Sequence, residues 1–326
     1  MKISFYNEKM QRVAIIEERF VSCFWSEGYN TIENFTIELQ ETPEHKEKVK
    51  VDYYVGRSDR KTLMVIKTVT IKDKKIVASG KQASAVLDDV AFVGTINENS
   101  KVDTAIENAY TNSSMFDGVK IVSGNIEEKY PCQISNKSFS NLCETMCQKT
   151  DVGFRSVKGD GCVNIEFYKP KTQENLVFSQ KFGNLTVSAI SVSSQSHKNY
   201  AIVLGEGEGE NRVRVDIDNS NGETKREIII DAKDIQKAEN ETEEAYEARL
   251  LTRGMEKLID CQKVFNFAFS PFEKDFGKKY DLGDVLTVLI PEYRIKLQAR
   301  VVRFTQKEQN NKINTTVEVG NLIVKR

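Results

Sequence analysis

Apolar and polar residues alternate with a period of two near both ends of this 326-residue chain. Phe35, Ile37 and Leu39 are separated by single polar residues, and the pattern recurs from Tyr293 to Val301 and from Ile313 to Val319. A period of two places apolar side chains on one face of a strand and polar ones on the other. The sequence therefore predicts half-buried strands at both ends and a mainly β chain.

Further strand-like runs fill the first ninety or so residues. Val49 to Val55 also alternates, and Leu63 to Ile71 and Ile76 to Ala78 flank the charged stretch 72–75. A short charged connection between two β-rich runs is typical of a hairpin loop. We expect a β meander or a small barrel in this part of the chain.

Helical periodicity marks three segments: one after Ser100 and one after Ser138, both of which are expected N-caps, and one over about 240–262. In the last, Asn240 is the expected N-cap, and Glu243 follows at capping-box spacing. The apolar stripes of the second and third helices predict burial of Leu142, Met146, Leu251, Met255 and Leu258.

Glycine-containing turns separate other strand-like runs. Residues 158–161, Lys-Gly-Asp-Gly, lie between two such runs, and Asn221-Gly222 lies between Val213–Val215 and Ile228–Ile230. Asn-Gly tolerates positive φ at both central positions and is expected to form a hairpin turn. Asn310-Asn311 is expected to turn the chain within a C-terminal antiparallel meander.

Chain length predicts two domains, or one large domain with an insertion, and the changes of pattern divide the chain into three segments. We expect an N-terminal β domain at residues 1–95, a middle α/β domain at 96–182, and a second β domain at 183–326 that contains the helix near 240–262. The fold class is therefore mainly β with α+β elements, and the domains can be discontinuous.

Charge and hydropathy remove several classes of function. The chain has 47 Lys and Arg against 48 Asp and Glu, so no overall field attracts nucleic acid or anionic lipid. No run approaches the roughly 18 apolar residues of a membrane helix, and the first residues lack the pattern of a signal peptide. We expect no sequence-specific nucleic-acid binding, no membrane insertion and a cytoplasmic origin.

Candidate catalytic residues are few. Only two histidines occur, His45 and His197, both in polar stretches that predict solvated loops. Six cysteines form no C-x-x-C pair, and Cys143 and Cys147 lie on the apolar face of a predicted helix, which favours packing over metal or redox chemistry. We expect no catalytic residue, no cofactor and no metal.

One acidic, glycine-rich segment stands out: Gly205, Glu206, Gly207, Glu208, Gly209 and Glu210. Its carboxylates would repel a phosphate, and strand-type residues follow instead of a helix, so a phosphate loop is disfavoured. The neighbouring stretch 216–222 fails as a calcium loop, because Ile217 and Ile228 occupy the positions of two required acidic ligands. A close approach of another subunit, which the glycines would permit, and a solvated surface loop remain open for this segment.

Five motifs occur in order in the last half of the chain: YAIVLGEGEGENRVRVDID, REIIIDAKDI, EEAYEARLLTRGMEKL, YDLGDVLTVLI and TTVEVGN. Together they resemble the tail-hub proteins of long-tailed phages, also called baseplate hub or tail-tip proteins. The resemblance is best from about residue 185 onward. It gains support from the predicted helix at Phe139 to Cys147 and the TDVGFRS that follows.

This resemblance implies two β-barrel-like domains and a middle α/β domain, and a homotrimer that joins the sixfold tail tube to the distal tip. It implies contacts with a distal tail or tail-tube protein, a tape-measure protein and a tip or spike protein, and passage of DNA or the tape measure. In such a ring, Gly205–Glu210 is the candidate for a subunit contact or a channel-facing position. The expected location is a virion tail or tail-like particle assembled in the bacterial cytoplasm. Bacteriocin-like tails and contractile injection devices use similar hubs, so the expectation covers a prophage-encoded or tail-like particle as well as an infectious virion.

Two other classes of function stay open at this stage. Carboxylates between Gly205 and Glu210 could serve a cell-wall hydrolase, although hub relatives carry that activity in a C-terminal extension beyond the point where this chain ends at Arg326. Aromatic loops could instead form a carbohydrate-binding module.

Overall fold

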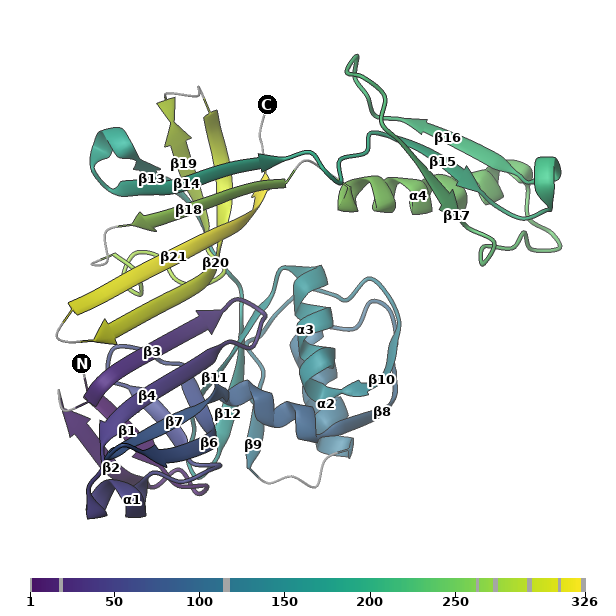
Figure 1. The fold of residues 1–326 in the computed structure, drawn as a ribbon. Coiled ribbons are helices and arrows are strands. Elements are labelled where there is room, and N and C mark those ends of the chain that lie inside the picture. The colour runs from purple at the N-terminus through teal and green to yellow at the C-terminus, as the bar shows by residue number, and fades with distance from the viewer. Residues whose placement is uncertain are drawn as a thin grey trace. The chain divides into compact units, whose positions relative to one another are not determined.

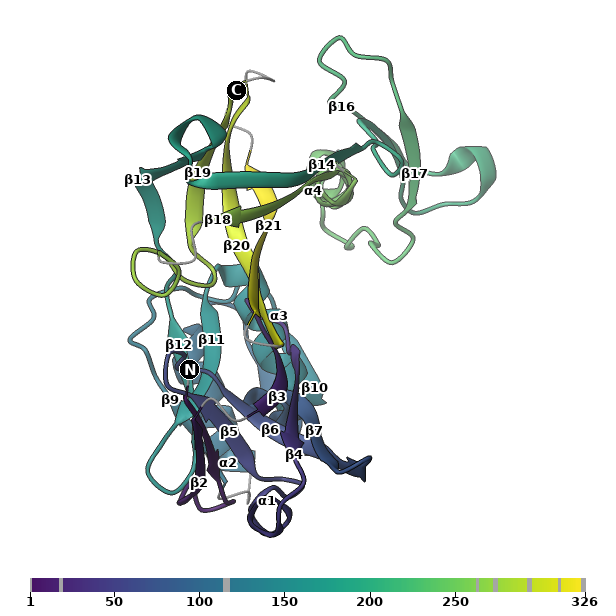
Figure 2. The same ribbon diagram turned by 60° about the vertical axis from the view of Figure 1, so that its left-hand side comes forward.

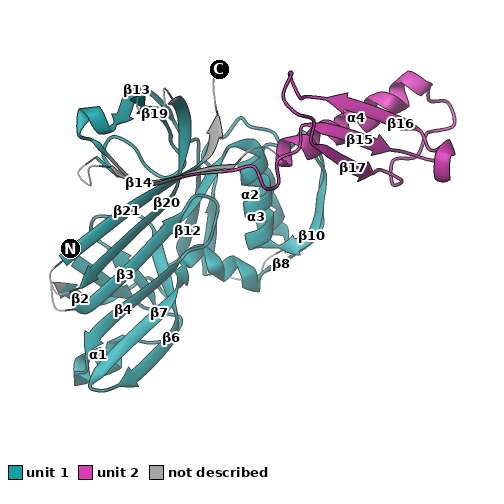
Figure 3. Ribbon diagram, turned by 45° about the horizontal axis from the view of Figure 1, so that its top comes forward, with its two compact units in different colours: residues 1–188, 268–326 teal, residues 189–267 magenta. Residues whose placement is uncertain are grey.

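A computed structural model describes residues 2–17, 20–113, 118–261, 264–271, 275–291, 295–309 and 312–323 of the protein. The chain divides into two compact units (Figure 3). Unit 1 is Met1–Ser188 with Ala268–Arg326, and unit 2 is Ala189–Phe267. Strands dominate, so the mainly β class is confirmed. The division into three domains stays a prediction.

The largest sheet takes strands from both ends of the chain (Figure 1). The early strands are β1 (Lys2–Tyr6), β2 (Arg12–Glu17), β3 (Phe20–Gly28), β4 (Asn34–Gln40), β5 (Tyr54–Arg57), β6 (Leu63–Lys72) and β7 (Lys75–Gln82). The late strands are β13 (Thr172–Ser179), β14 (Leu185–Ser193), β18 (Val264–Pro271), β19 (Val285–Ile290), β20 (Ile295–Gln309) and β21 (Lys312–Ile323).

Strand order in this sheet is β14-β18-β21-β20-β3-β4-β7-β6-β5-β1-β2, and β19 pairs with β20 and β13. Within the described residues β14 and β2 each have one neighbour on this path, so the sheet is open and no sheet closes into a barrel. The barrel-like elements expected from the sequence are thus open sheets.

Strands β3 and β20 join the two ends of the chain. They pair antiparallel from Arg303 opposite Gly28 to Gln309 opposite Ser22. Strand β20 also pairs with β19 and β21, which confirms the C-terminal meander (Figure 2). Tyr293, Arg294 and the predicted turn Asn310-Asn311 lie outside the described residues.

The N-terminal strands confirm the period-two pattern. Phe35, Ile37 and Leu39 of β4 are fully buried, together with Trp25 of β3. Strands β6 and β7 form the predicted hairpin, in which Lys72 pairs with Lys75. Its two central residues, Asp73 and Lys74, both have positive φ, as a tight two-residue hairpin loop requires.

The run from Val49 to Tyr53 is not a strand, contrary to the sequence prediction. Thr42 caps a short helix, α1 (Pro43–Lys48), by accepting a hydrogen bond from His45 N at 3.1 Å. That helix ends at Lys48, and residues 49–53 form a turn before β5: Tyr53 N donates to Lys50 O at 3.3 Å, and Asp52 has a φ of 63°, which an extended strand does not allow. His45 accordingly lies on a helix and not in a loop.

The middle part of unit 1 packs two helices on two small sheets. Its elements are the 3-10 helix η1 (Ala83–Asp89), β8 (Ala91–Ile96), α2 (Val102–Ser113), β9 (Val119–Val122), β10 (Ile134–Ser138), α3 (Phe139–Thr150), β11 (Gly153–Lys158) and β12 (Val163–Tyr168). β8 pairs with β10, and β12 lies between β11 and β9. β11 and β12 form the hairpin predicted around residues 158–161.

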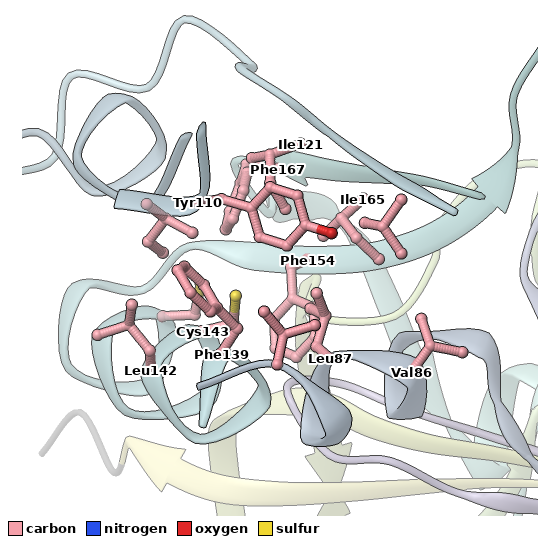
Figure 4. Close-up of a cluster of buried hydrophobic side chains, with 14 of the residues drawn as sticks. Val86, Leu87, Tyr110, Ile121, Phe139, Leu142, Cys143, Phe154, Ile165 and Phe167 are labelled. Atoms are coloured by element: carbon pink, nitrogen blue, oxygen red, sulfur yellow. The ribbon is translucent and has the colours of Figure 1, made fainter. Parts of the chain in front are cut away.

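Phe139 lies at the centre of this core (Figure 4). Its ring meets those of Tyr110 and Phe92 edge-on, with centroids 5.1 and 5.7 Å away. Ser138 Oγ accepts a hydrogen bond from Asn141 N, as predicted for the N-cap of α3. Leu142 and Met146 are fully buried, which confirms the predicted apolar stripe.

Cys143 and Cys147 belong to the same core. Both are fully buried, and burial raises the pKa of Cys143 to about 12 and that of Cys147 well above its usual range. A thiol that stays protonated is a poor nucleophile and metal ligand. The packing interpretation of this pair is confirmed.

Unit 2 is a three-stranded sheet with one long helix. Strand β15 (Tyr200–Leu204) lies between β16 (Arg214–Asp218), antiparallel, and β17 (Glu227–Asp231), parallel; α4 (Glu243–Asp260) packs on them. Two further 3-10 turns are η2 (Gln180–Phe182) in unit 1 and η3 (Gly209–Asn211) in unit 2.

The Asn221-Gly222 prediction is half right. Both residues have positive φ, 48° and 87°, as expected of a turn. The hairpin is wrong, because β15 lies between β16 and β17 and pairs with each of them. The turn therefore lies in a connection that crosses the end of the central strand β15, from β16 on one side to β17 on the other.

Helix α4 differs from the prediction in its start and in its buried face. Thr242, not Asn240, is the N-cap, and its hydroxyl accepts from Ala245 N at 3.3 Å. Leu258 is buried as predicted, but Leu251 and Met255 are 48% and 36% exposed.

Close packing at Gly254 selects the face of α4 that is buried. A Cβ at Gly254 would lie 2.3 Å from Ile217 Cδ1. Only a glycine admits that approach, which turns Tyr246, Leu250 and Leu258 toward the sheet and leaves the neighbouring stripe outside.

Leu258→Ala should lower the free energy of unfolding of unit 2 by about 2–5 kcal/mol, because the side chain is enclosed. Leu251→Ala makes the same chemical change on the exposed side of the helix. In the monomeric protein it should lower the free energy of unfolding by less than about 0.5 kcal/mol. Chemical denaturation followed by circular dichroism compares the two; equal losses would contradict the packing of α4.

Candidate functional site

The acidic segment predicted from the sequence, Gly205–Glu210, follows β15 and leads through η3 toward β16. Gly205 is buried, whereas residues 206–210 are exposed. The segment thus begins inside unit 2 and then emerges into solvent.

Hydrogen bonds fix the base of this segment. Gly205 N donates to Val213 O at 2.8 Å, and Val213 N donates to Glu206 O at 3.0 Å, so the ladder of β15 and β16 continues into the loop. Tyr246 Oη accepts from Glu206 N at 2.7 Å and donates to Ile235 O at 2.9 Å. Helix α4 therefore holds the loop in place.

The three carboxylates of the segment differ. Glu206 Oε2 accepts from Lys237 N at 3.0 Å. Glu208 and Glu210 have no ion pair or side-chain hydrogen bond among the residues that the structure describes. Positive φ at Gly207 and Gly209 shapes the exposed part. The segment displays two unpaired negative charges on a fixed base; its role as a subunit contact or channel-facing element stays a prediction.

Gly205→Ala should destabilise unit 2 by about 1–3 kcal/mol, the usual cost of overpacking. A Cβ at Gly205 would lie 2.5 Å from Tyr246 Oη and 2.7 Å from Leu250 Cδ1. Thermal unfolding of the variant tests this. Glu208→Ala, on the exposed part, should leave the melting temperature unchanged; a comparable loss there would mean that the whole loop is packed.

His197 is not the solvated loop residue that the sequence predicts. It is buried, and its Nδ1 lies 3.2 Å from Cys261 O, so the ring connects the start of β15 with the end of α4. In the described part of the chain no group of three or more His, Cys, Asp or Glu is placed to hold a metal ion. No described helix is long and apolar enough to cross a membrane.

A buried charged cluster connects the N-terminal strands to the late strands in unit 1; we call it the Glu27 cluster (Glu27, Trp25, Arg60, Thr62, Asp281). Glu27 Oε1 accepts from Arg60 Nε and Trp25 Nε1, both at 2.8 Å. Glu27 Oε2 accepts from Arg60 Nη2 at 2.9 Å and Thr62 Oγ1 at 2.7 Å.

Every oxygen of Glu27 is therefore occupied. Burial alone would raise the pKa of Glu27, but the Arg60 guanidinium and the hydrogen bonds outweigh burial and lower it. A carboxylate held ionised and fully bonded is a structural anchor and is not available as a general acid or base.

A cavity of about 480 Å³ lies elsewhere in unit 1, lined by Tyr29, Asn30, Thr31, Gln148, Asp151, Val285, Arg300, Val302 and Arg303. Its charges are paired: Arg300 forms an ion pair with Asp151, and Arg303 with Glu33 and Glu318. The lining that the structure describes offers no nucleophile beside a base, and we assign it no chemistry.

Sequence reasoning missed one surface of unit 2, the α4 stripe (Leu251, Met255, Ile259). These residues are 48%, 36% and 66% exposed. Their four-residue spacing is visible in the sequence, where it was interpreted as the buried face. The position of Gly254 is the signal that could have separated the two stripes.

Comparison with known proteins gives a family for the chain. The family described as Siphovirus ReqiPepy6 Gp37-like protein matches residues 2–321. No curated protein sequence matches the chain.

Several solved structures share the fold over nearly the whole chain. A 43 kDa tail protein of prophage MuSo2 from Shewanella oneidensis has a TM-score of 0.63 at 14% identity, covering 98% of this chain and 97% of that one. Prophage tail protein gp18 from Listeria monocytogenes has a TM-score of 0.60 at 11% identity and 98% and 94% coverage. A tail protein from Neisseria meningitidis has a TM-score of 0.60 at 10% identity and 98% and 96% coverage.

Proposed function

Because the chain belongs to the Siphovirus ReqiPepy6 Gp37-like family of phage tail proteins, we propose that it is the hub at the distal end of a tail. Three copies form a ring that joins the tail tube to the tip and lets DNA or a tape-measure protein pass. The family match over residues 2–321 carries this proposal. The shared fold of prophage tail proteins supports it.

The partners follow from that position in a tail. They are a distal tail or tail-tube protein on one side, a tip or spike protein on the other, and a tape-measure protein in the channel. In the ring, the Gly205–Glu210 segment lies at a subunit contact or faces the channel, where Glu208 and Glu210 would repel passing DNA. The protein acts in a virion tail or tail-like particle assembled in the bacterial cytoplasm.

Native mass spectrometry of the full chain at micromolar concentration tests the ring. Closed cyclic symmetry satisfies every copy of a contact, so the expected mass is that of three chains. A chain that stays monomeric alone and when mixed with its neighbouring tail proteins would overturn the hub assignment.

The proposed role is structural and not enzymatic. Purified protein should leave cell walls intact in a zymogram, and a chelator should not change its unfolding transition. Wall digestion that is lost on Glu208→Gln would instead favour a hydrolase.

A further inference from the structure

The α4 stripe is an exposed apolar surface on one flank of the helix, and the opposite flank carries ion pairs. On the flank of α4 that faces away from the stripe, Arg249 pairs with Glu241 and Arg253 pairs with Asp234. The stripe itself carries Leu251, Met255 and Ile259 at four-residue spacing, so they follow one another along one side of the helix. Three exposed apolar side chains in a row on one helix face make this surface a candidate contact site.

Acidic residues extend the stripe toward the start of the helix. Glu244 and Glu247 lie seven and four residues before Leu251, on the same side, and both are exposed. Neither forms an ion pair with any residue in the described ranges. The surface therefore combines apolar side chains with unpaired negative charge.

The net charges of the two units restrict the occupant. Residues 189–267 contain 11 Lys and Arg against 16 Asp and Glu, a net charge of −5. The whole chain carries −1, so unit 1 carries +4. Two copies of unit 2 would repel each other, whereas unit 2 of one copy and unit 1 of another attract.

Unit 1 offers a matching surface at the tip of the β6–β7 hairpin. Ile71 is 51% exposed there. Lys72 is the last residue of β6 and Lys74 lies in the turn, with the exposed Asp73 between them. Both lysines are exposed and form no ion pair within the described residues. An apolar side chain beside two unpaired positive charges complements the α4 stripe and its two glutamates.

We propose that the α4 stripe of one copy docks on the β6–β7 hairpin tip of a second copy. This inference rests on the proposed ring. The contact is heterologous, because each copy uses its α4 stripe to bind one neighbour and its β6–β7 hairpin tip to bind the other. Such head-to-tail contacts close into a ring when the rotation between copies permits.

Two double variants test the contact. Leu251→Ser with Ile259→Ser removes the stripe, and Lys72→Glu with Lys74→Glu reverses the hairpin charge. Each should weaken self-association at least about a hundredfold, as expected when two apolar or two charged groups are lost from a contact centre. All four positions are exposed, so the melting temperature should not change.

A mixture of the two variants provides the decisive readout in native mass spectrometry. Each variant keeps the surface that the other has lost, so the mixture should form one-to-one dimers and no ring. The control, Glu256→Ser with Asp260→Ser, changes the other flank of α4 and should assemble like the wild type.

Three results would overturn the inference while leaving the hub proposal intact: wild-type assembly by either double variant, no dimer in the mixture, or loss of assembly in the control. If the stripe variant loses binding only to a neighbouring tail protein, the occupant is that protein and not a second copy. A wild-type chain that never assembles removes the hub proposal and this inference together.

Discussion

Replacing Glu27 with Gln should lower the free energy of unfolding by about 3–5 kcal/mol, the usual cost of removing one partner of a buried ion pair. Glu27 is fully buried, and the Arg60 side chain is only 8% exposed. Among the residues that the structure describes, the substitution leaves the guanidinium with Asp281, at 3.2 Å, as its remaining carboxylate. Chemical denaturation measures the loss.

A surface ion pair provides the control. Lys101 and Glu127 lie 2.8 Å apart, and both side chains are exposed. Glu127→Gln should cost less than about 1 kcal/mol, because solvent screens the pair. Equal effects at Glu27 and Glu127 would contradict the structural role of the Glu27 cluster.

The same carboxylate makes stability depend on pH. The pKa of Glu27 is lower in the folded protein than its ordinary value of 4.5. The folded state therefore favours the ionised form, and the resulting stabilisation is complete above the ordinary pKa and lost as pH falls through the folded one. Glu27→Gln should reduce the slope of stability against pH below about 4.5.

Phe139→Ala should cost about 3–5 kcal/mol, because it empties a fully buried aromatic site. The ring also loses its edge-on contacts with Tyr110 and Phe92. Near-ultraviolet circular dichroism during denaturation should report an earlier transition of unit 1.

Phe182→Ala is the matched control for this change. Phe182 is 64% exposed, so the same truncation should shift stability by no more than about 0.5 kcal/mol. A small effect at Phe139 together with a large one at Phe182 would contradict the described core.

Local pattern predicted those elements whose neighbours in space are also neighbours in sequence. The β6–β7 hairpin and helix α3 are of this kind: a charged two-residue turn and a Ser138 cap are sufficient to specify them. Apolar spacing also identified Leu142 and Met146 as buried, because α3 has a single apolar face.

Prediction from the sequence failed where tertiary packing determines which of two locally possible arrangements forms. On α4 two apolar stripes compete, and the contact of Gly254 with Ile217 buries one and exposes the other. The order of β16, β15 and β17 likewise depends on a parallel pairing, between β15 and β17, that no turn residue specifies.

The Glu27 cluster lay beyond sequence reasoning for a further reason. Arg60 bonds both Glu27 and Asp281, which are 254 positions apart, and nothing in the local pattern of either carboxylate identifies Arg60 as the shared partner. Of the candidate site, only the segment Gly205–Glu210 was identified in advance, by its composition. The exposed stripe became apparent only once the buried face was known.

The pairing of β3 with β20 has a kinetic consequence. Glu27 of β3 pairs with Phe304 of β20, which is synthesised 277 residues later. One hydrogen-bonding edge of β3 therefore stays unpaired until β20 has been made. At bacterial synthesis rates of roughly 5–20 residues per second, that edge stays open for about 14–55 s on the ribosome. An open strand edge is a template for pairing with the wrong chain. The nascent protein should therefore depend on chaperones until its last strands emerge, and overproduction should favour aggregates nucleated at β3.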